Sequence, residues 1–208
     1  MDGDGGMEIV TGGGYWDGEN PAESQLCVWS GASLAFEKVK TFHWGYSDNG
    51  IWCIAIGNVD NDASMEIVTG SSYWDGPSYG LLCVWSGLTL GLESYTTWGT
   101  SVHIYGVSLG DVDGDGKAEI VTGGTVYNGS YMVFQLCVWS TVWGTYSMVL
   151  ENNQTWLWGN SASVNSVAIG DVDGGGLKEI ITGGEYFDGW GGGWIAQLCV
   201  WEIGGSIL

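Results

Sequence analysis

The chain has 208 residues, of which 45% are hydrophobic, 38 are glycine and 2 are proline, a composition typical of a folded, turn-rich β-protein rather than a disordered chain. It carries 24 acidic residues against four lysines and no arginine, and the net charge of −20 makes nucleic acid and anionic membrane surfaces poor partners. No apolar run approaches the roughly 20 residues that span a bilayer, and the N-terminus lacks the basic and apolar regions of a signal peptide, so we expect no membrane insertion.

One acidic phrase occurs four times along the chain. The copies are DGDGGMEIVTGGG from Asp2, GNVDNDASMEIVTGS from Gly57, GDVDGDGKAEIVTGG from Gly110 and GDVDGGGLKEIITGG from Gly170. A second phrase follows each copy: QLCVWS at Gln25, LLCVWS at Leu81, QLCVWS at Gln135 and QLCVWE at Gln197. The equivalent residues Asp2, Asp60, Asp113 and Asp173 are 58, 53 and 60 residues apart, a period that indicates a solenoid or a propeller.

Each full unit divides into four short strands separated by turn residues, with no helical period. In the third unit the strands are predicted at about 102–109, 119–122, 135–140 and 146–155. Four antiparallel strands per unit favour a β-propeller blade over a solenoid. We therefore predict an all-β propeller of about four blades over 1–208, as one domain or a propeller segment, with units at approximately 1–45, 46–99, 100–159 and 160–208. The first unit lacks its innermost strand and the last stops where a fourth strand would start, so both should be incomplete.

The phrases VNSVAIGDVDGGGLKEIITGG and DVDGDGKAEIVTGG resemble the FG-GAP and VCBS repeats of integrin α-subunit propellers and of related bacterial and archaeal proteins. The resemblance covers essentially the whole chain. It implies a calcium-binding propeller that serves in binding or adhesion, outside the cell or at its surface. The chain departs from the family pattern in the Glu that closes each acidic loop, where the family usually has Asp, and in the tryptophan-rich LCVW strand.

The third acidic loop is the most complete metal-binding pattern. Oxygen ligands at alternate positions let a tight loop wrap one hard cation, and glycine permits the bend. The predicted ligands are Asp111, Asp113, Asp115, the carbonyl of Lys117, and Glu119, a set similar to the calcium loop of integrin propellers. Carboxylate and carbonyl oxygens without nearby His or Cys favour Ca²⁺ over zinc or copper.

The other three loops keep parts of this set. The second offers Asn58, Asp60, Asp62, the Ser64 carbonyl and Glu66; the fourth offers Asp171, Asp173, the Leu177 carbonyl and Glu179; the first offers Asp2, Asp4, the Gly6 carbonyl and Glu8. The fourth has Gly175 in place of the third Asp and the first has no residue at its first position, so we expect weaker binding there. The alternative is that these are Asp-Gly turns whose side chains cap their own backbone. Because carboxylates crowded in one loop repel one another, a bound cation should act as a staple.

A second candidate site is aromatic and lies on the opposite face of the propeller. In an antiparallel blade, the loops between strands two and three share a face with the junctions between blades, away from the metal loops. The candidate ligand-binding residues there are Tyr15, Trp16, Tyr73, Trp74, Tyr127, Tyr186, Phe187, Trp190 and Trp194. Exposed aromatic rings stack on sugars or anchor a protein partner. The alternative is packing between blades, which we expect for the strand residues Trp29, Trp85, Trp139 and Trp201 and favour for the junction residues Trp44, Trp98 and Trp158.

The cysteines are interpreted as structural. Cys27, Cys83, Cys137 and Cys199 occupy the same place in each LCVW phrase, and equivalent positions in separate repeats are usually too far apart to bridge. We expect them to be small buried apolar side chains. Cys53 has no counterpart, so no disulfide is predicted.

No catalytic pattern stands out, and the chain is predicted not to be an enzyme. His43 and His103 do not recur, and Glu185 and Asp188 are not singled out as a glycoside hydrolase pair. The leading hypothesis is a calcium-stabilised binding or adhesion module with a protein or glycan ligand. The alternatives are a carbohydrate-binding, lectin-like propeller and a structural segment of a larger surface protein. A second copy of the chain that completes the ring is a further candidate partner, since open strand edges recruit partners.

Overall fold

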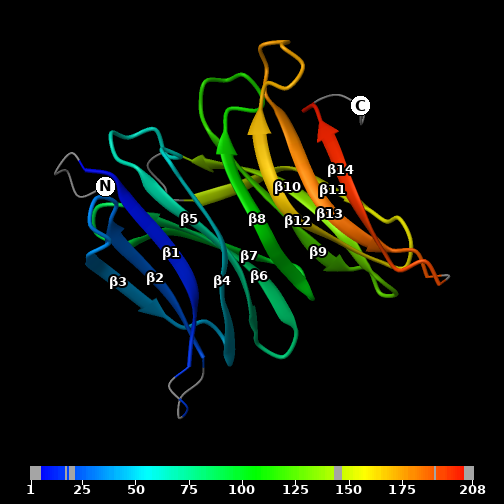
Figure 1. The fold of residues 1–208 in the computed structure, drawn as a ribbon, viewed down its shortest axis with the longest axis horizontal. Helices are drawn as coiled ribbons and strands as arrows, with labels where there is room; N and C mark the ends of the chain where they lie inside the picture. The colour runs from blue at the N-terminus through cyan, green and yellow to red at the C-terminus, as the bar shows by residue number, and fades with distance from the viewer. Residues whose placement is uncertain (1–5, 17, 19–21, 143–146, 190, 204–208) are drawn as a thin grey trace.

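The computed structural model describes residues 6–16, 18, 22–142, 147–189 and 191–203, and this part of the chain is all β (Figure 1). The strands are β1 (Glu8–Tyr15), β2 (Glu23–Ser30), β3 (Phe36–Phe42), β4 (Ser47–Gly57), β5 (Glu66–Trp74), β6 (Ser78–Ser86), β7 (Leu92–Trp98), β8 (Val102–Gly110), β9 (Glu119–Tyr127), β10 (Met132–Val142), β11 (Ser147–Trp156), β12 (Ser161–Gly170), β13 (Glu179–Phe187) and β14 (Trp194–Trp201). These residues include no helix that is long and apolar enough to cross a membrane.

The strands form four antiparallel sheets, each made of neighbours in sequence: β1-β2-β3, β4-β5-β6-β7, β8-β9-β10-β11 and β12-β13-β14. We call them blades 1 to 4. Figure 1 shows them following one another from blue to red, with β4, β8 and β12 next to one another. This confirms the predicted propeller blades of four strands, with three strands in the first and last blades.

Within the third blade the predicted strand positions are right, but the two middle strands were predicted too short. β9 continues to Tyr127 instead of ending at Thr122, and β10 begins at Met132 instead of Gln135. The ladder between them runs on to the pair Tyr127 and Met132. Gly123 and Gly124 follow the predicted end of this strand, but they lie inside β9 because their backbone still pairs with β10.

Neighbouring blades pack through two chemically different sheet faces. We call the face that carries the Leu and Val of the LCVW phrase the forward face, and the face that carries its Cys and Trp the rear face. The forward residues Leu82 and Val84 of blade 2 form one buried cluster with Ile120, Cys137 and Trp139 on the rear face of blade 3. The same pattern joins blade 1 to blade 2 and blade 3 to blade 4. Each interior blade therefore presents one face forward and the other backward.

An aromatic pair reinforces each of these three contacts. Phe42 lies on Trp85, Trp98 on Trp139, and Trp156 on Trp201, with ring centroids 4.6 Å apart in all three pairs. The indole N–H of each of these LCVW tryptophans also donates to a threonine of the adjacent strand; the threonines are Thr69, Thr122 and Thr182. Packing between blades, predicted for the strand tryptophans, is confirmed at these three. Trp29 instead contacts Phe36 of its own blade, at a centroid distance of 5.3 Å.

All five cysteines are free, and the four equivalent ones are buried. Burial raises the pKa of Cys53 and of Cys137 from 9.0 to about 12.

We expect iodoacetamide at pH 8 to leave Cys137 of the native protein largely unlabelled, because a pKa near 12 leaves on the order of a thousandfold less thiolate, the reactive form. Mass spectrometry of peptides should show full labelling of all five cysteines only after unfolding in guanidinium. Labelling of native Cys137 at the rate of the unfolded chain would contradict its buried, structural role.

Candidate metal centre

The acidic loops of blades 2, 3 and 4 lie at one end of the blades. They connect β4 to β5, β8 to β9 and β12 to β13, and Figure 1 shows them at the upper side, with the β5–β6, β9–β10 and β13–β14 turns at the lower side. Equivalent strands run in the same direction in successive blades, so equivalent loops must share a face. The acidic loops and the aromatic turns therefore lie at opposite ends of the blades, as predicted.

The third loop folds through its own carboxylates. Asp111 accepts hydrogen bonds from the N–H groups of Gly114 (2.7 Å) and Gly116 (3.0 Å), and Asp113 accepts one from Asp115 (2.9 Å). Both glycines have a positive φ, 82° and 87°, which a side chain would disfavour. The second loop has Asn61 at the place of Gly114, with a φ of 65°, a conformation that asparagine tolerates.

The loop also brings its carboxylates together. Oxygen atoms of Asp111, Asp113 and Asp115 lie within 4.8 Å of one another, as a shared cation would require. Asp115 is additionally bonded to Lys117, whose backbone N–H lies 2.8 Å and whose ammonium lies 3.0 Å from its two oxygens. The lysine hydrogen bonds lower the pKa of Asp115. Three of the five predicted ligands thus lie close together in a loop whose carboxylates also cap its own backbone.

A buried glutamate closes each of these loops. Glu66, Glu119 and Glu179 are at most 3% exposed, and each accepts a hydrogen bond from a backbone N–H at the start of its loop, over 3.0, 2.9 and 2.8 Å. Burial raises the pKa of Glu66 to about 7 and also raises the pKa of Glu119, although these hydrogen bonds oppose the shift. Glu66 and Glu119 are thus carboxylates whose charge the surrounding protein does not balance.

Two glutamates of the outermost strands join these clusters, and the sequence reasoning missed them. Glu93 of β7 lies with Asp60 and Glu66, and Glu151 of β11 lies with Asp113 and Glu119, in both cases with oxygens within 4.8 Å. Both stand at a β-bulge, where two residues face one of the LCVW strand. Glu37 holds the same bulge position in β3. A Leu-Glu or Phe-Glu pair in the outermost strands β3, β7 and β11 was the signal available in the sequence.

One carboxylate oxygen in the cluster of blade 2 lacks a hydrogen-bond partner. Oε2 of Glu93 is fully buried and accepts no hydrogen bond within the part of the chain that the structure describes. Burial, together with the charges of Asp60 and Asp62, raises the pKa of this carboxyl group, although a hydrogen bond with the Ser86 side chain opposes the shift. A buried carboxylate oxygen without a donor is costly, and a cation between Glu93, Asp60 and Glu66 would remove that cost.

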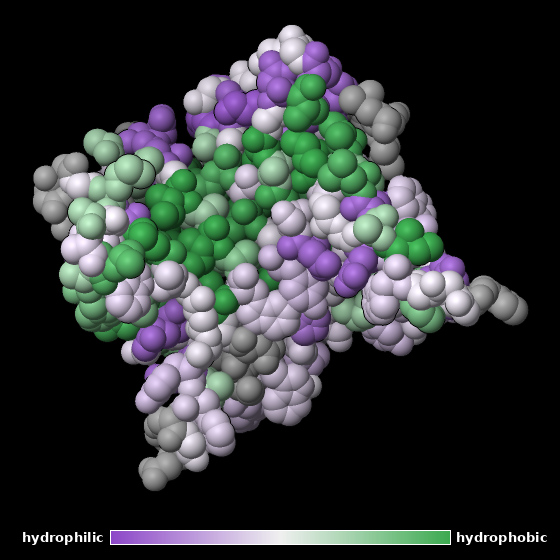
Figure 2. Space-filling view, in the orientation of Figure 1, coloured by the Kyte–Doolittle hydropathy of each residue, from purple (hydrophilic) through white to green (hydrophobic). Residues whose placement is uncertain are grey.

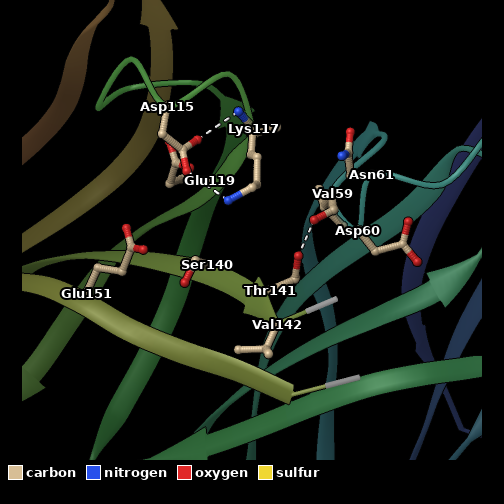
Figure 3. A pocket seen from close by; sticks show the side chains of 11 residues that line it. Val59, Asp60, Asn61, Asp115, Lys117, Glu119, Ser140, Thr141, Val142 and Glu151 are labelled. Carbon is tan, nitrogen blue, oxygen red and sulfur yellow. Dashed lines mark hydrogen bonds and ion pairs between the residues drawn. The ribbon is translucent and has the colours of Figure 1, made fainter. Parts of the chain in front are cut away.

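A pocket of about 380 Å³ opens between the loops of blades 2 and 3 (Figure 3). Its wall includes Asp60 from blade 2 and Asp115, Glu119 and Glu151 from blade 3. The Thr141 hydroxyl donates to the Val59 carbonyl and bridges the two blades at this pocket. The pocket thus touches Asp60 of the blade 2 cluster and carboxylates of both blade 3 clusters.

The remaining predicted ligands are brought together only in part. Asp171, Asp173 and Glu179 form a cluster in the fourth loop, where Leu177 is 61% exposed. In the second loop Asp62 is outside the cluster. Its carboxylate accepts a hydrogen bond from the Ser64 N–H, and the Asn58 side-chain N–H donates to its carbonyl.

In the first loop Asp2 and Asp4 lie outside the described residues. Glu8 begins β1, directly after Gly6 and Met7, and it is half-buried.

The aromatic candidates stand at the strand ends next to the turns between second and third strands. Tyr15, Tyr73, Trp74, Tyr127, Tyr186 and Phe187 end second strands, Trp194 begins β14, Trp16 directly follows β1, and Trp190 lies outside the described residues. Adjacent side chains alternate across the sheet. Tyr73 accordingly stacks near Trp44 and Tyr79, whereas Trp74 is 47% exposed. The exposed members are Tyr15, Trp16, Trp74, Tyr127 and Trp194.

An all-β chain of antiparallel blades with an acidic loop between the first two strands of a blade defines a propeller built from repeats. The family model of the FG-GAP repeat matches residues 103–133, which span β8, the third acidic loop, β9 and the start of β10. This confirms that the chain carries an FG-GAP repeat, as the resemblance implied. A search of curated proteins found no match.

Proposed function

We propose that the protein is a non-enzymatic propeller in which Ca²⁺ staples the acidic loops and the opposite, aromatic face contacts a partner, so that it acts as a binding or adhesion module. The observation that carries the calcium part is the buried, unpartnered Oε2 of Glu93 beside Asp60 and Glu66. The FG-GAP repeat in blade 3 supports the same function, because the resemblance implies calcium-bound binding propellers.

The donor chemistry supports calcium over other metals. The clusters offer only carboxylate oxygens, and hard oxygen donors suit Ca²⁺ rather than zinc or copper. In blade 2 the ligands would be Asp60, Glu66 and Glu93. The cation would supply positive charge in a protein whose net charge is −20.

The equivalent set in blade 3 would be Asp113, Glu119 and Glu151, with Asp111 and Asp115 on the solvent side. Bound there, the cation would tie the loop to the outermost strand β11 as well as closing the loop on itself. A rigid acidic loop at one end of blade 3 would in turn fix the position of the β9–β10 hairpin at the other end.

The partner-binding part of the proposal rests on exposed rings. Trp16, Trp74 and Trp194 are 69%, 47% and 59% exposed and lie at the hairpin ends of three different blades. Exposed tryptophan of this kind anchors protein partners and also stacks on sugars. A glycan array separates the two ligand classes, because a lectin-like propeller binds individual glycans and a protein-binding one does not.

Isothermal titration calorimetry should show binding of Ca²⁺ to chelator-treated protein, with much weaker binding of Mg²⁺. Glu93→Gln and Glu151→Gln should each weaken one site by about tenfold or more, because they remove a charged ligand. Glu185→Gln is the matched control, since Glu185 pairs with Ala196 in the half of blade 4 away from the loops.

Absence of calcium binding at millimolar concentration would overturn the proposal. Equal affinity in the Glu93→Gln and Glu185→Gln proteins would show that the bulge glutamates are not ligands.

A further inference from the structure

The forward face of blade 4 is exposed where the same face of every other blade is buried. The leucine of the LCVW phrase is 0% exposed at Leu26, 0% at Leu82 and 4% at Leu136, but 74% at Leu198. In the three buried cases the next blade covers the leucine. Blade 4 thus keeps the apolar side chain that a following blade would cover.

A glycine on the same forward face shows the same difference. A side chain at Gly70 would come within 2.7 Å of Ile104, and one at Gly123 within 2.5 Å of Val164, both in the next blade. Gly183 holds the equivalent place in blade 4 and has nothing within 4 Å of a side chain built there. Blade 4 therefore has the clearance that a neighbouring blade needs as well as the apolar surface.

The rear face of blade 1 is exposed in the complementary way. Ile9 is 42% exposed, although the equivalent Ile67 and Ile120 are fully buried. Leu34 is 67% exposed, whereas Leu90 at the same place in the turn of blade 2 is 4% exposed. In blade 2 these residues are buried by the forward face of blade 1.

We propose that the forward face of blade 4 docks onto the rear face of blade 1 of a second copy of this chain, head to tail. Inside the chain a forward face meets a rear face three times, with the same residue types on each side. The two uncovered faces are one of each kind, so a second copy continues the established contact. Figure 2 shows apolar surface running from the region of β1 to that of β14. This inference goes beyond the calcium proposal and does not depend on it.

Sedimentation equilibrium of the full chain should give twice the monomer mass of 22.2 kDa in calcium-containing and in chelated buffer. Leu198→Asp and Ile9→Asp should each give monomers at concentrations where the unmodified chain is dimeric. Gly183→Val should do the same, because it fills the clearance without straining the strand. Leu88→Asp, at a leucine 53% exposed in the turn between β6 and β7, is the control and should stay dimeric. Circular dichroism checks that each variant is folded.

Mixing the variants tests the head-to-tail geometry. Leu198→Asp and Ile9→Asp proteins together should regain a dimer, because one of the two contacts then joins two unmodified faces. A monomeric unmodified chain would overturn the proposal and assign the two faces to another segment or partner. A Leu198→Asp protein that still forms dimers would also overturn the proposal. So would a dimer that is lost in Leu198→Asp but kept in Ile9→Asp, because that result would indicate a contact between two copies of blade 4.

Discussion

Calcium at a hundred times its dissociation constant should raise the midpoint of thermal unfolding of the chelated protein by about 5–11 °C for one occupied site. Such occupancy stabilises the folded state by about 2.7 kcal/mol, and about 1 kcal/mol shifts the midpoint of a chain of this size by about 2–4 °C. Differential scanning calorimetry with magnesium at equal concentration tests the specificity. Asp113→Asn should lose the part of the gain that the blade 3 site contributes, because Asp113 belongs to both clusters of blade 3.

Asp75→Asn is the matched control for this measurement, because Asp75 lies in the β5–β6 turn on the opposite face. A shift that is equal in both variants would mean that calcium acts by general screening of the acidic protein.

The pH dependence of the metal-free protein follows from Glu66. Burial raises its folded-state pKa to about 7, above the ordinary value of 4.5, so folding favours its protonated form. The corresponding stability is fully present below pH 4.5 and is lost as the pH rises through 7. The unfolding midpoint in chelator should therefore fall between pH 5 and pH 8, and saturating calcium should reduce that fall. A metal-free protein that gains stability over this range would contradict the account of the closing glutamates.

Trp85→Ala should destabilise the protein by about 3–5 kcal/mol, the range found for buried large aromatic residues. Trp85 is 1% exposed, lies 4.6 Å from the ring of Phe42 in blade 1, and donates its indole N–H to Thr69 over 2.9 Å. Its loss would leave a cavity between two blades. Guanidinium unfolding followed by circular dichroism measures the effect.

Trp16→Ala is the control, because Trp16 is 69% exposed and should change stability by about 0.5 kcal/mol or less. Thr69→Val separates the hydrogen bond from the packing and should cost about 1–3 kcal/mol, since it leaves the buried indole N–H unpaired. A loss in Trp85→Ala no larger than in Trp16→Ala would mean that the aromatic pairs between blades contribute little.

The blades and the loop positions were predictable because the sequence pattern of each strand and turn recurs in every repeat. Consecutive apolar residues in EIVTG and LCVW indicate a strand that is buried on both faces, because adjacent side chains point to opposite sides of a sheet. The lengths of the hairpins were not predictable, since the Gly-Gly pair signals a turn in sequence while its backbone remains paired in the sheet.

The bulge glutamates Glu93 and Glu151 were missed for a different reason. They lie 27 and 32 residues beyond Glu66 and Glu119, and only the shifted register at the bulge turns them toward the loop. The aromatic candidates could not be separated into buried and exposed residues, because sequence alone does not show which way a side chain points. Tyr73 and Trp74 are neighbours in sequence, but the pleat of the strand directs Tyr73 inward and Trp74 to solvent.

Gly70 and Gly123 stand where a side chain would run into the next blade, and their lack of one therefore helps to set the angle between blades. A methyl group at either place would push adjacent blades apart on that side and change the angle through which each blade turns. A small change of angle, repeated at every contact, alters how many blades return the chain to its starting point. The angle between neighbouring blades in this protein thus depends on the absence of side chains at a few strand positions.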